Sequence, residues 1–514
     1  MISVTSSAQA AAADKAAIEA GTPSRALMQR AGAAAAAEIA ARFPSEMERG
    51  VVVVTGGGNN GGDGWVIARA LCAAGIAARV IECVAAKTPD CIAERELALA
   101  DGVQSDADAH TILSAPESLF VDALLGTGLT ADEPLLGAIA TGVACLHARV
   151  KRGAIVVAID VPTGVDATNG LHVGAVRSAC TLTFGTMKRG LLVARDRCGD
   201  IVLLDIGLGA HGAKASRSML ATPRWFHDTL PPIAADAHKG TRKKIVVVGG
   251  AEGMAGAAIL ASRAALRSGA GMVKCVVARE SLQALQEAEP AALSSAWPES
   301  DADAADHIGK WADAVLIGPG LGRARAREMV ERVLRVFAGP VVLDADALNA
   351  FEGDVDALAA LLKGREALLT PHPAEFARLA GGDVDEILPE RFEVVPAFAR
   401  RVGATVLFKG VPTIVCSPAG KSIVVAEGTP ILATGGAGDV LGGIAATLVA
   451  QAGSAIRGGA LAAFAHGRAA SAVSRDQVRG YTLEDVVAAL PSVWSLDAPA
   501  PRPPVLVELP RVGE

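Results

Sequence analysis

The chain has 514 residues, of which 51% are hydrophobic but only 3% aromatic, and its formal net charge is −7. A chain of this length exceeds what one hydrophobic core can organise, so we expect about two to four domains. An acidic chain lacks the basic surface that attracts nucleic acid or an anionic membrane, and we expect neither as a partner.

Eight cysteines are scattered along the chain without a Cys-x-x-Cys pair. This spacing argues against a zinc site or a disulfide framework and fits a reducing cytosol. The N-terminus lacks the basic and then apolar pattern of a signal peptide. The longest membrane-like run, Val440–Ile456, contains Gly442, Gly443 and Gln451 and follows Asp439, which favours a buried helix. We therefore predict a cytoplasmic protein.

Short apolar segments alternate with helical segments through the first 210 residues. This alternation is typical of βαβ units and predicts a parallel sheet covered by helices. Two Ala-rich segments, 8–20 and 25–42, are predicted helices on this block, as is 65–74. The predicted strands are 51–55, 79–84, 119–124, 154–160, 179–184 and 201–205.

A second block of the same kind follows a break at about 210–237, where Pro231-Pro232 forbids a helix. From Ala498 the chain is Pro-rich, and we expect a loosely ordered tail. The predicted strands of this block are 245–248, 272–277, 314–317, 341–344, 405–408 and 423–425, and its main helices are 256–268, 324–337 and 440–451. We predict domains at 1–212 and 226–493, a linker at 213–225 and a tail at 494–514.

The loop GGGNNGGDG, residues 56–64, follows the first predicted strand after the N-terminal helices. Three of its glycines fit the dinucleotide fingerprint G-x-G-x-x-G and Glu82 ends the next strand, so a nicotinamide dehydrogenase is one alternative. That fingerprint does not explain Asn59, Asn60 and Asp63. Two amides and an acid indicate recognition of a polar group and oxygen ligation of a cation.

Two further strand ends carry acids. Asp122 precedes a glycine turn, and Asp160 leads into a turn in which Pro162 adds stiffness and Thr163 a hydroxyl. Each acid alone could be a turn or helix cap. Because ligands bind beyond the carboxyl ends of parallel strands, the two acids, the hydroxyl and Asn60 together predict a hard-cation site.

The motifs GGGNNGGDG, VDALLGTG, IDVPTGVDATNG and TFGTMKRGL resemble the NAD(P)H-hydrate epimerase family over about residues 1–210. The resemblance implies a Rossmann-like three-layer αβα domain. Epimerisation at C6 of a hydrated nicotinamide ring requires loss and return of hydroxide, and Asp160 is our candidate for the general acid or base. The resemblance implies potassium ligation by Asn60, Asp122 and Thr163, where the family often has Ser in place of this threonine. It implies substrate binding by Asn59, Asn60, Gly61, Gly62, Asp63, Gly126, Thr127, Gly128, Leu129, Thr130, Ala131, Asp132 and Asp160.

In the second block, the turn TGGAGDVLGG at 434–443 brings Asp439 to the first turn of an apolar helix. Gly435, Gly436 and Gly438 let backbone N–H groups converge at the positive end of the helix dipole, which predicts an anion cradle. A carboxylate beside such a cradle can take a proton from a hydroxyl that attacks a phosphoryl group. The alternative is a glycine C-cap followed by a capping acid.

Other strand ends add candidates to this edge of the second sheet. Lys409 brings a cation, and the tight turn GPGLG follows another strand. Asp344 and Asp346 either face a metal or cap the following helix, and we favour the cap. His372 stands between two prolines in a stiff loop, which favours a ligand contact over an inert surface histidine.

The motifs HKG, VVVGG, GMAGAAILASRAALRSGAG, GPGLG, LDADALN, TPHPAEF, FKG and GGAGDVLGG resemble the nucleotide-dependent NAD(P)H-hydrate dehydratase family over about residues 226–493. The family has a ribokinase-like αβα fold, so the whole chain is expected to be an α/β protein of two domains. One departure is Ala374, where the family commonly has Gly. The implied substrate contacts are Ala257, Gly320, His372 and Asp439, and the implied nucleotide contacts are Lys409, Gly410, Val411, Pro412, Thr413, Thr429, Thr434, Gly435, Gly436, Ala437 and Gly438.

Together the two resemblances imply a bifunctional repair enzyme for hydrated NADH and NADPH. It would interconvert the R and S hydrates and dehydrate the S form with ADP or ATP, through a phosphorylated intermediate that Asp439 helps to form. The implied ions are K⁺ and Mg²⁺, and we expect a homo-oligomer. The alternative is a ribokinase-like small-molecule kinase fused to a non-catalytic nucleotide-binding or scaffold domain.

Overall fold

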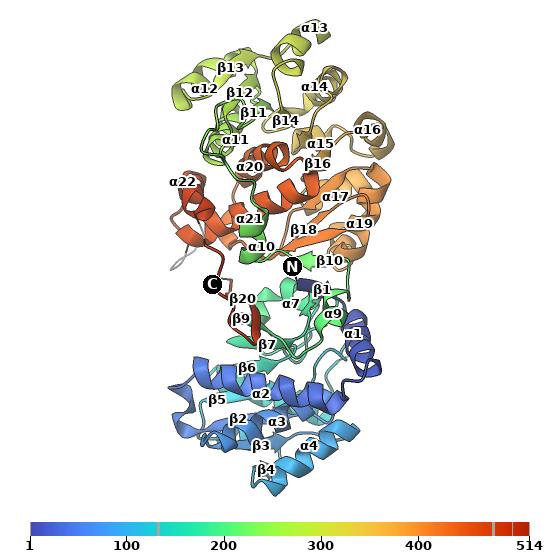
Figure 1. The fold of residues 1–514 in the computed structure, drawn as a ribbon, viewed down its shortest axis with the longest axis vertical. Coiled ribbons are helices and arrows are strands. Elements are labelled where there is room, and N and C mark those ends of the chain that lie inside the picture. Colours follow the sequence, from blue (N-terminus) through green and yellow to red (C-terminus); the bar gives the residue numbers. More distant parts are fainter. Residues whose placement is uncertain (1, 131–133, 475–478, 496, 513–514) are drawn as a thin grey trace. The chain divides into compact units, whose positions relative to one another are not determined.

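The computed structural model describes residues 2–130, 134–474, 479–495 and 497–512 and divides into two compact units (Figure 1). The N-terminal unit comprises Ile2–Arg217 together with Ala500–Val512, and the C-terminal unit comprises Ser218–Pro499. Ala131 and Asp132, two predicted substrate contacts, lie outside the described residues. Within the part of the chain that is described, no helix is long and apolar enough to cross a membrane.

The N-terminal unit contains a sheet with the strand order β20-β9-β7-β6-β5-β2-β3-β4. All neighbours are parallel except β20, which runs antiparallel to β9. Its central strands are buried on both faces, which explains their continuous apolar sequences. A short parallel pair joins β1 and β8. The strands are β1 Ile2–Thr5, β2 Val51–Thr55, β3 Ala78–Glu82, β4 Gln104–Asp106, β5 Leu119–Ala123, β6 Ile155–Ile159, β7 Cys180–Phe184, β8 Met187–Lys188, β9 Asp200–Leu204 and β20 Val505–Leu509.

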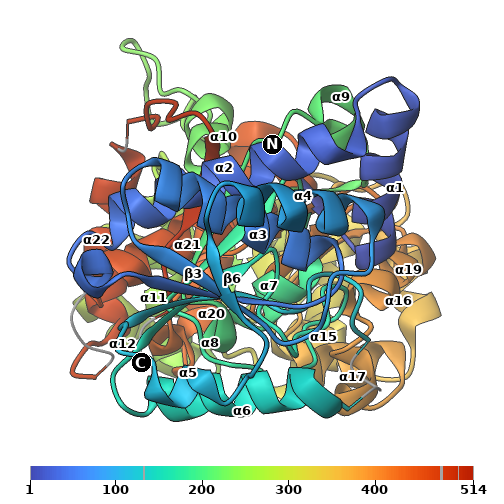
Figure 2. The same cartoon turned by 90° about the horizontal axis from the view of Figure 1, so that it is seen from below.

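Helices cover both faces of this sheet, so the unit has three layers (Figure 2). One face carries α2, α3 and α4, and the other carries α5 and α6. The six strands and three helices predicted from the sequence are confirmed, while β1, β4 and β8 were not predicted. The helices are α1 Ser7–Glu19, α2 Ser24–Arg42, α3 Asn59–Ala73, α4 Pro89–Ala100, α5 Thr111–Ser114, α6 Gly137–Val150, α7 Arg189–Val193, α8 Arg195–Cys198 and α9 Gly209–Ala213.

The sheet of the C-terminal unit has the order β13-β12-β11-β14-β15-β16-β17-β18-β19-β10. It is parallel from β13 to β17, whereas β18 runs antiparallel to both of its neighbours. Within the expected linker region, β10 already pairs with β19 of this sheet. The strands are β10 Ser218–Leu220, β11 Lys244–Val248, β12 Met272–Val277, β13 Leu293–Ala296, β14 Ala314–Ile317, β15 Val341–Leu343, β16 Ala367–Leu369, β17 Thr405–Phe408, β18 Thr413–Cys416 and β19 Ser422–Val425.

Four helices, α11, α20, α21 and α22, pack with the sheet into one large apolar core. They are rich in Ala and Gly, which lets helix backbones approach closely. A Cβ on Gly443 of α20 would collide with the backbone of Ala261 on α11. A second layer contains α14, α15, α16, α17 and α19. The helices are α10 Pro223–Thr229, α11 Ala255–Arg267, α12 Leu282–Ala288, α13 Asp301–Ala304, α14 Arg323–Val336, α15 Asp346–Asn349, α16 Val355–Leu362, α17 Pro373–Ala380, α18 Val384–Ile387, α19 Arg391–Val402, α20 Ala437–Ala452, α21 Ala455–Val473 and α22 Leu483–Trp494.

The C-terminal segment differs from the loosely ordered tail that we expected. It returns to the N-terminal unit, where β20 pairs with β9. Arg42 donates two hydrogen bonds to Glu508, at 2.9 and 2.8 Å, and these bonds hold the pKa of the Glu508 carboxyl below its ordinary value. Arg502 pairs with Glu38 at 3.3 Å. Because of its prolines, this segment was not predicted as a strand, yet β20 covers the edge of the sheet at β9.

We expect Val507→Asp to detach β20, because Val507 is 7% exposed and an unpaired carboxylate is costly to bury. A loss of about 2 kcal/mol lowers the unfolding midpoint of a unit of this size by several degrees. Hydrogen exchange should then accelerate at the β9 amides. Leu506→Asp is the matched control, since Leu506 is 45% exposed on the opposite side of the same strand. Equal exchange in the two variants would contradict a stabilising role for β20.

Candidate active sites

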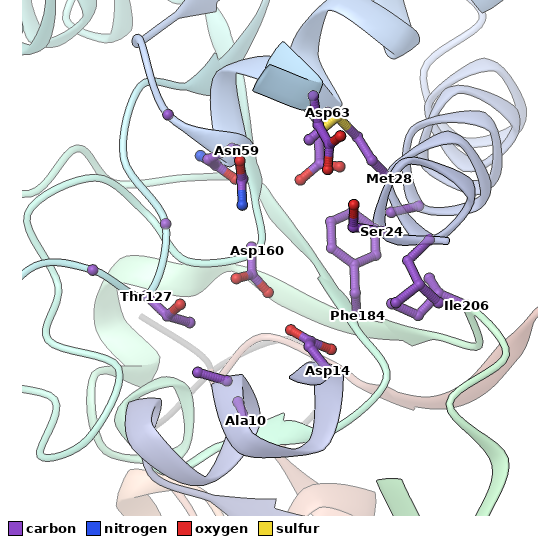
Figure 3. A pocket seen from close by; sticks show the side chains of 18 of the residues that line it. Ala10, Asp14, Ser24, Met28, Asn59, Asp63, Thr127, Asp160, Phe184 and Ile206 are labelled. Atoms are coloured by element: carbon purple, nitrogen blue, oxygen red, sulfur yellow. The ribbon is translucent and has the colours of Figure 1, made fainter. Parts of the chain in front are cut away.

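A cavity of about 470 Å³ lies at the carboxyl ends of the strands of the N-terminal unit (Figure 3). The start of α3 supplies Asn59, Asn60 and Asp63, the turn after β5 supplies Gly126–Gly128, and Asp160 follows β6. Helices α1 and α2 complete the wall. The structure therefore brings together predicted residues from three separate strand ends. Among the described residues that were predicted as substrate contacts, Gly61, Gly62, Leu129 and Thr130 do not line this cavity.

Asp160 is held in place at the cavity wall by Lys188. The Nζ atom of Lys188 lies 2.5 Å from Asp160 Oδ1 and also donates to the Phe184 carbonyl at 2.9 Å. The Thr183 hydroxyl donates to the same carboxylate oxygen at 3.1 Å. Asp160 has a φ of 64°, a left-handed conformation that costs energy in a residue other than glycine and often marks a functional site. Its carboxylate is thus oriented by two donors.

Lys188 is a functional candidate that sequence reasoning missed, although it lies within the motif TFGTMKRGL. Its side chain is only 4% exposed. A lysine that follows a buried strand at the ligand-binding edge of a sheet was the available signal. Identifying its partner required the contact with Asp160, 28 residues away in sequence.

Asp122 and Thr163 form a buried hydrogen-bonded pair. The Thr163 backbone N–H donates to Asp122 Oδ2 at 2.9 Å and its hydroxyl donates to Oδ1 at 2.7 Å. Burial nevertheless raises the pKa of Asp122, because these bonds offset the loss of hydration only in part. Nearby, the Asn60 amide is buried and neither of its polar atoms has a hydrogen-bond partner among the described residues, while a Cβ on Gly126 would lie 3.4 Å from it. An unpartnered amide and a buried carboxylate fit a hard cation.

In the C-terminal unit, Lys409 lies among carboxylates at the end of β17. Its Nζ atom is 2.9 Å from Asp344 Oδ1 and 3.7 Å from Glu375 Oε2. Burial lowers the pKa of Lys409, but Asp344 and Glu375 outweigh that effect and the net direction is upward. Lys409 is thus a cation at the strand edge, as the sequence predicted.

The interpretation of Asp344 and Asp346 as caps of the following helix is wrong. Asp344 is buried and accepts hydrogen bonds from Lys409 and from the Thr370 hydroxyl, the latter at 2.8 Å. Asp346 accepts from the Gly322 N–H at 2.9 Å. Neither side chain caps α15, since these long-range partners satisfy both acids. Sequence reasoning therefore missed Asp344 as part of the site.

Asp439 lies in the first turn of α20, as predicted. The helix begins after Gly436, whose φ of 95° is easily reached only by glycine. A Cβ on Gly438 would lie 3.3 Å from both Asp344 Oδ2 and Lys409 Nζ, so the turn rests directly on that ion pair. Burial and then the Asp344 charge raise the pKa of Asp439 to about 7. A carboxyl with this pKa can exchange protons at neutral pH.

His372 caps α17 rather than standing in a merely stiff loop. Its Nδ1 atom accepts from the N–H groups of Ala374 and Glu375, at 3.2 and 3.4 Å, and Glu375 accepts from the His372 N–H at 2.9 Å. Burial lowers the pKa of the ring. The half-exposed ring remains accessible, and its contact with a ligand stays a prediction.

The remaining predicted contacts occupy three places. A Cβ on Gly320 would lie 3.0 Å from Ala257, so these two are neighbours. The loop 409–413 joins β17 to β18, and Arg391 anchors it through the Val411 carbonyl at 2.9 Å. Thr429 accepts from the Ser474 hydroxyl, and Thr434 donates to the Ile431 carbonyl. These contacts fix the positions of the residues, and their binding of substrate or nucleotide stays a prediction.

His466 and Asp439 should affect acid stability in opposite directions. His466 on α21 is 5% exposed, and burial, with a smaller effect of Lys409, lowers its pKa to about 4. In the unfolded chain the imidazole of His466 takes up a proton below pH 6.5, its ordinary pKa, whereas in the folded chain it stays neutral down to about pH 4. The free energy of unfolding therefore falls by about 3 kcal/mol between pH 6.5 and 4. Asp439, with its raised pKa, adds stability that is complete below pH 3.8 and is lost as pH rises through about 7.

We therefore expect His466→Gln to flatten the acid loss of stability in the C-terminal unit and Asp439→Asn to steepen it. Urea unfolding midpoints between pH 4 and 7 measure both slopes. Slopes that change in the same direction would contradict the assignment of these two pKa shifts.

The fold and the sites define a two-domain α/β protein with a candidate ligand site of acid–base side chains at the carboxyl edge of each sheet. A family model described as NAD(P)H-hydrate dehydratase matches residues 245–492, and one described as YjeF-related protein N-terminus matches residues 24–190. The bifunctional NAD(P)H-hydrate repair enzyme Nnr of Salinibacter ruber is 35% identical, with 89% of this chain and 90% of that protein covered. The enzyme of the same name from Escherichia coli K12 is 34% identical over 90% of this chain and 88% of its own length.

The chain belongs to the bifunctional NAD(P)H-hydrate repair enzyme family. Among solved structures, the ADP/ATP-dependent NAD(P)H-hydrate dehydratase of Bacillus subtilis, co-crystallised with ATP and Mg²⁺, is 27% identical with a TM-score of 0.47. That match covers 54% of this chain and 97% of the other. The family and the two-domain α/β fold class predicted from the sequence are confirmed.

Proposed function

We propose that the N-terminal unit interconverts the R and S forms of hydrated NADH and NADPH, and that the C-terminal unit dehydrates the S form with ADP or ATP. The observation that supports the second reaction most directly is Asp439, with a pKa of about 7, in a glycine-rich helix start that rests on Lys409. For the first reaction the support is the Asp160–Lys188 pair at the wall of the cavity.

In the dehydration, Asp439 takes the proton of the C6 hydroxyl, and the oxygen attacks the terminal phosphoryl group of the nucleotide. Backbone N–H groups of the turn 435–438 and the Lys409 ammonium group stabilise the charge on the phosphoryl oxygens. Phosphate is a better leaving group than hydroxide, so it leaves C6 while C5 loses a proton, and the C5=C6 double bond of the reduced nicotinamide ring is restored. The proposed substrate contacts are Ala257, Gly320, His372 and Asp439, and the proposed nucleotide contacts are residues 409–413, Thr429 and residues 434–438.

Two ions belong to this proposal. Asn60, Asp122 and Thr163 would hold K⁺, whose charge offsets that of the buried Asp122 carboxylate. Mg²⁺, when bound with the nucleotide, would offset the charge of its phosphates. We further propose that the enzyme acts in the cytoplasm as a homo-oligomer, without nucleic acid or membrane partners.

Incubation with acid-hydrated NADH and either ADP or ATP tests both reactions. Recovery of the absorbance of reduced nicotinamide from both hydrates is expected. If only the S fraction reacts and the R fraction remains, the epimerase assignment is wrong. A stable phosphorylated product without recovered dinucleotide would instead support the small-molecule kinase alternative.

A further inference from the structure

A third carboxyl enters the cavity of the N-terminal unit from a helix that the family model does not include. Asp14 lies on α1, and its side chain lines the same cavity as Asp160 and Asp63. Figure 3 shows Asp14 and Asp63 entering from different helices, with Asp160 between them in this view. The match to the N-terminal family model begins at residue 24, so Asp14 lies outside it.

Helix α1 is anchored against the substrate side of the cavity. The Ser6 hydroxyl and the Gln9 side chain form a capping box at its start. Ser7 links the helix to the rest of the wall: its hydroxyl donates to the Thr127 carbonyl at 2.5 Å, and its N–H donates to the Thr168 hydroxyl at 3.1 Å. The position of Asp14 is therefore fixed relative to the glycine turn that is proposed to contact the substrate.

Inversion at C6 through loss and return of hydroxide needs acid–base groups on two faces of the nicotinamide ring. One group protonates the hydroxyl as it leaves one face, and the other takes a proton from water that adds to the opposite face. The Asp160 carboxylate is oriented at the cavity wall, because Lys188 and the Thr183 hydroxyl both donate to it. The partner group must carry a proton when Asp160 carries none.

We propose that Asp14 is the second catalytic acid–base residue of the epimerase, paired with Asp160; this rests on the proposed epimerase function. Asp14 gives its proton to the departing C6 hydroxyl, the C6–O bond breaks, and the ring nitrogen lone pair forms the C=N bond of an iminium ion. Water then adds to the other face of C6 and its proton passes to Asp160. After one inversion Asp160 carries the proton and Asp14 does not, which is the state that the reverse inversion requires.

The electrostatic environment supports this division. Burial raises the pKa of Asp14, Lys188 lowers it in part, and the Asp160 charge raises it further. Asp63, which faces the cavity from α3, has a pKa raised by burial, by Asp160 and by Asp14. The protonated form is thus favoured at both Asp14 and Asp63, and Asp14 is the one of the two that reaches the cavity from α1.

The test uses the full chain and measures R-to-S conversion by chromatography without added nucleotide. Asp14→Asn should lower kcat by about 100-fold or more, with the dissociation constant of the hydrate changed by less than about threefold. The alkaline decline of the wild-type rate, where Asp14 loses its proton, should disappear, and Asp14→Glu should restore part of the rate. Glu19→Gln, an exposed acid on the same helix, is the matched control and should behave as wild type.

Several outcomes would overturn the proposal. Asp14→Asn at the wild-type rate would do so, as would loss of the alkaline decline in Asp63→Asn but not in Asp14→Asn. In ¹⁸O-labelled water each inversion should introduce one labelled oxygen at C6, and inversion that keeps the original oxygen would exclude the two-face mechanism. Absence of epimerisation in the wild type would instead contradict the proposed function itself. Unchanged hydrogen exchange at the amides of β2, β5 and β6 verifies that the N-terminal unit of each variant is folded.

Discussion

Asp439→Asn is expected to reduce dehydration of the S hydrate by about 1,000-fold or more. The amide has nearly the shape of the carboxyl but cannot take the proton of the C6 hydroxyl, and loss of a general base typically costs about 10²–10⁴-fold in rate. Nucleotide affinity should change by less than about threefold, because the backbone of the turn stays in place. Epimerisation in the other unit should be unaffected.

Glu484→Gln provides the matched control for this variant. Glu484 is an exposed acid in the first turn of α22, so its replacement removes the same kind of favourable contact with a helix dipole. Wild-type dehydration in this variant, beside the loss in Asp439→Asn, separates a proton-transfer role from capping. Loss of dehydration, nucleotide binding and epimerisation together in Asp439→Asn would show that the turn is structural.

The pH profile gives an independent measurement of the same role. The base must be ionised, so kcat/KM for dehydration should rise with pH through an apparent pKa of about 7. Asp344→Asn removes a negative charge that raises the pKa of Asp439 and should move this rise to lower pH. If kcat/KM of Asp344→Asn rises over the same pH range as in the wild type, the titrating group is not Asp439.

The sequence predicted the sheets well where strands are buried on both faces and read as continuous apolar runs, as in β2 and β11. In the second block it missed the short strands β10, β13, β16 and β18. It also missed β20, whose prolines and brief alternating pattern resemble a disordered tail. Strand pairing supplies the missing information in each case, since β20 is stable only against the edge of β9, about 300 residues earlier in the chain.

The site residues divide in a similar way. Asn60, Asp160 and Asp439 were identifiable because glycines and strand ends surround them in sequence. Asp344 and Lys188 were not, because local patterns indicate a cap or an ordinary surface charge, and their roles depend on partners 65 and 28 residues away. Local sequence therefore locates the edge of a sheet where ligands bind, whereas tertiary contacts determine which charges are paired there.

Asp160→Asn is expected to lower R-to-S conversion by about 1,000-fold, with dehydration of the S hydrate unchanged. Asn is the preferable replacement because it tolerates the left-handed conformation at φ 64°, whereas Ala would add backbone strain to the loss of the carboxylate. Lys188 would keep the Phe184 carbonyl and the Thr183 hydroxyl as partners, so the wall of the cavity should persist.

Asp205→Asn is the control for Asp160→Asn, since Asp205 also follows a strand but lies in an exposed turn, where its carboxylate accepts a hydrogen bond from the Gly207 N–H at 2.8 Å. We expect this variant to epimerise at the wild-type rate. If Asp160→Asn also retains full R-hydrate turnover, Asp160 is a turn acid of the same kind as Asp205. The N-terminal unit would then be a binding or scaffold domain, and the repair activity would reside in the C-terminal unit alone.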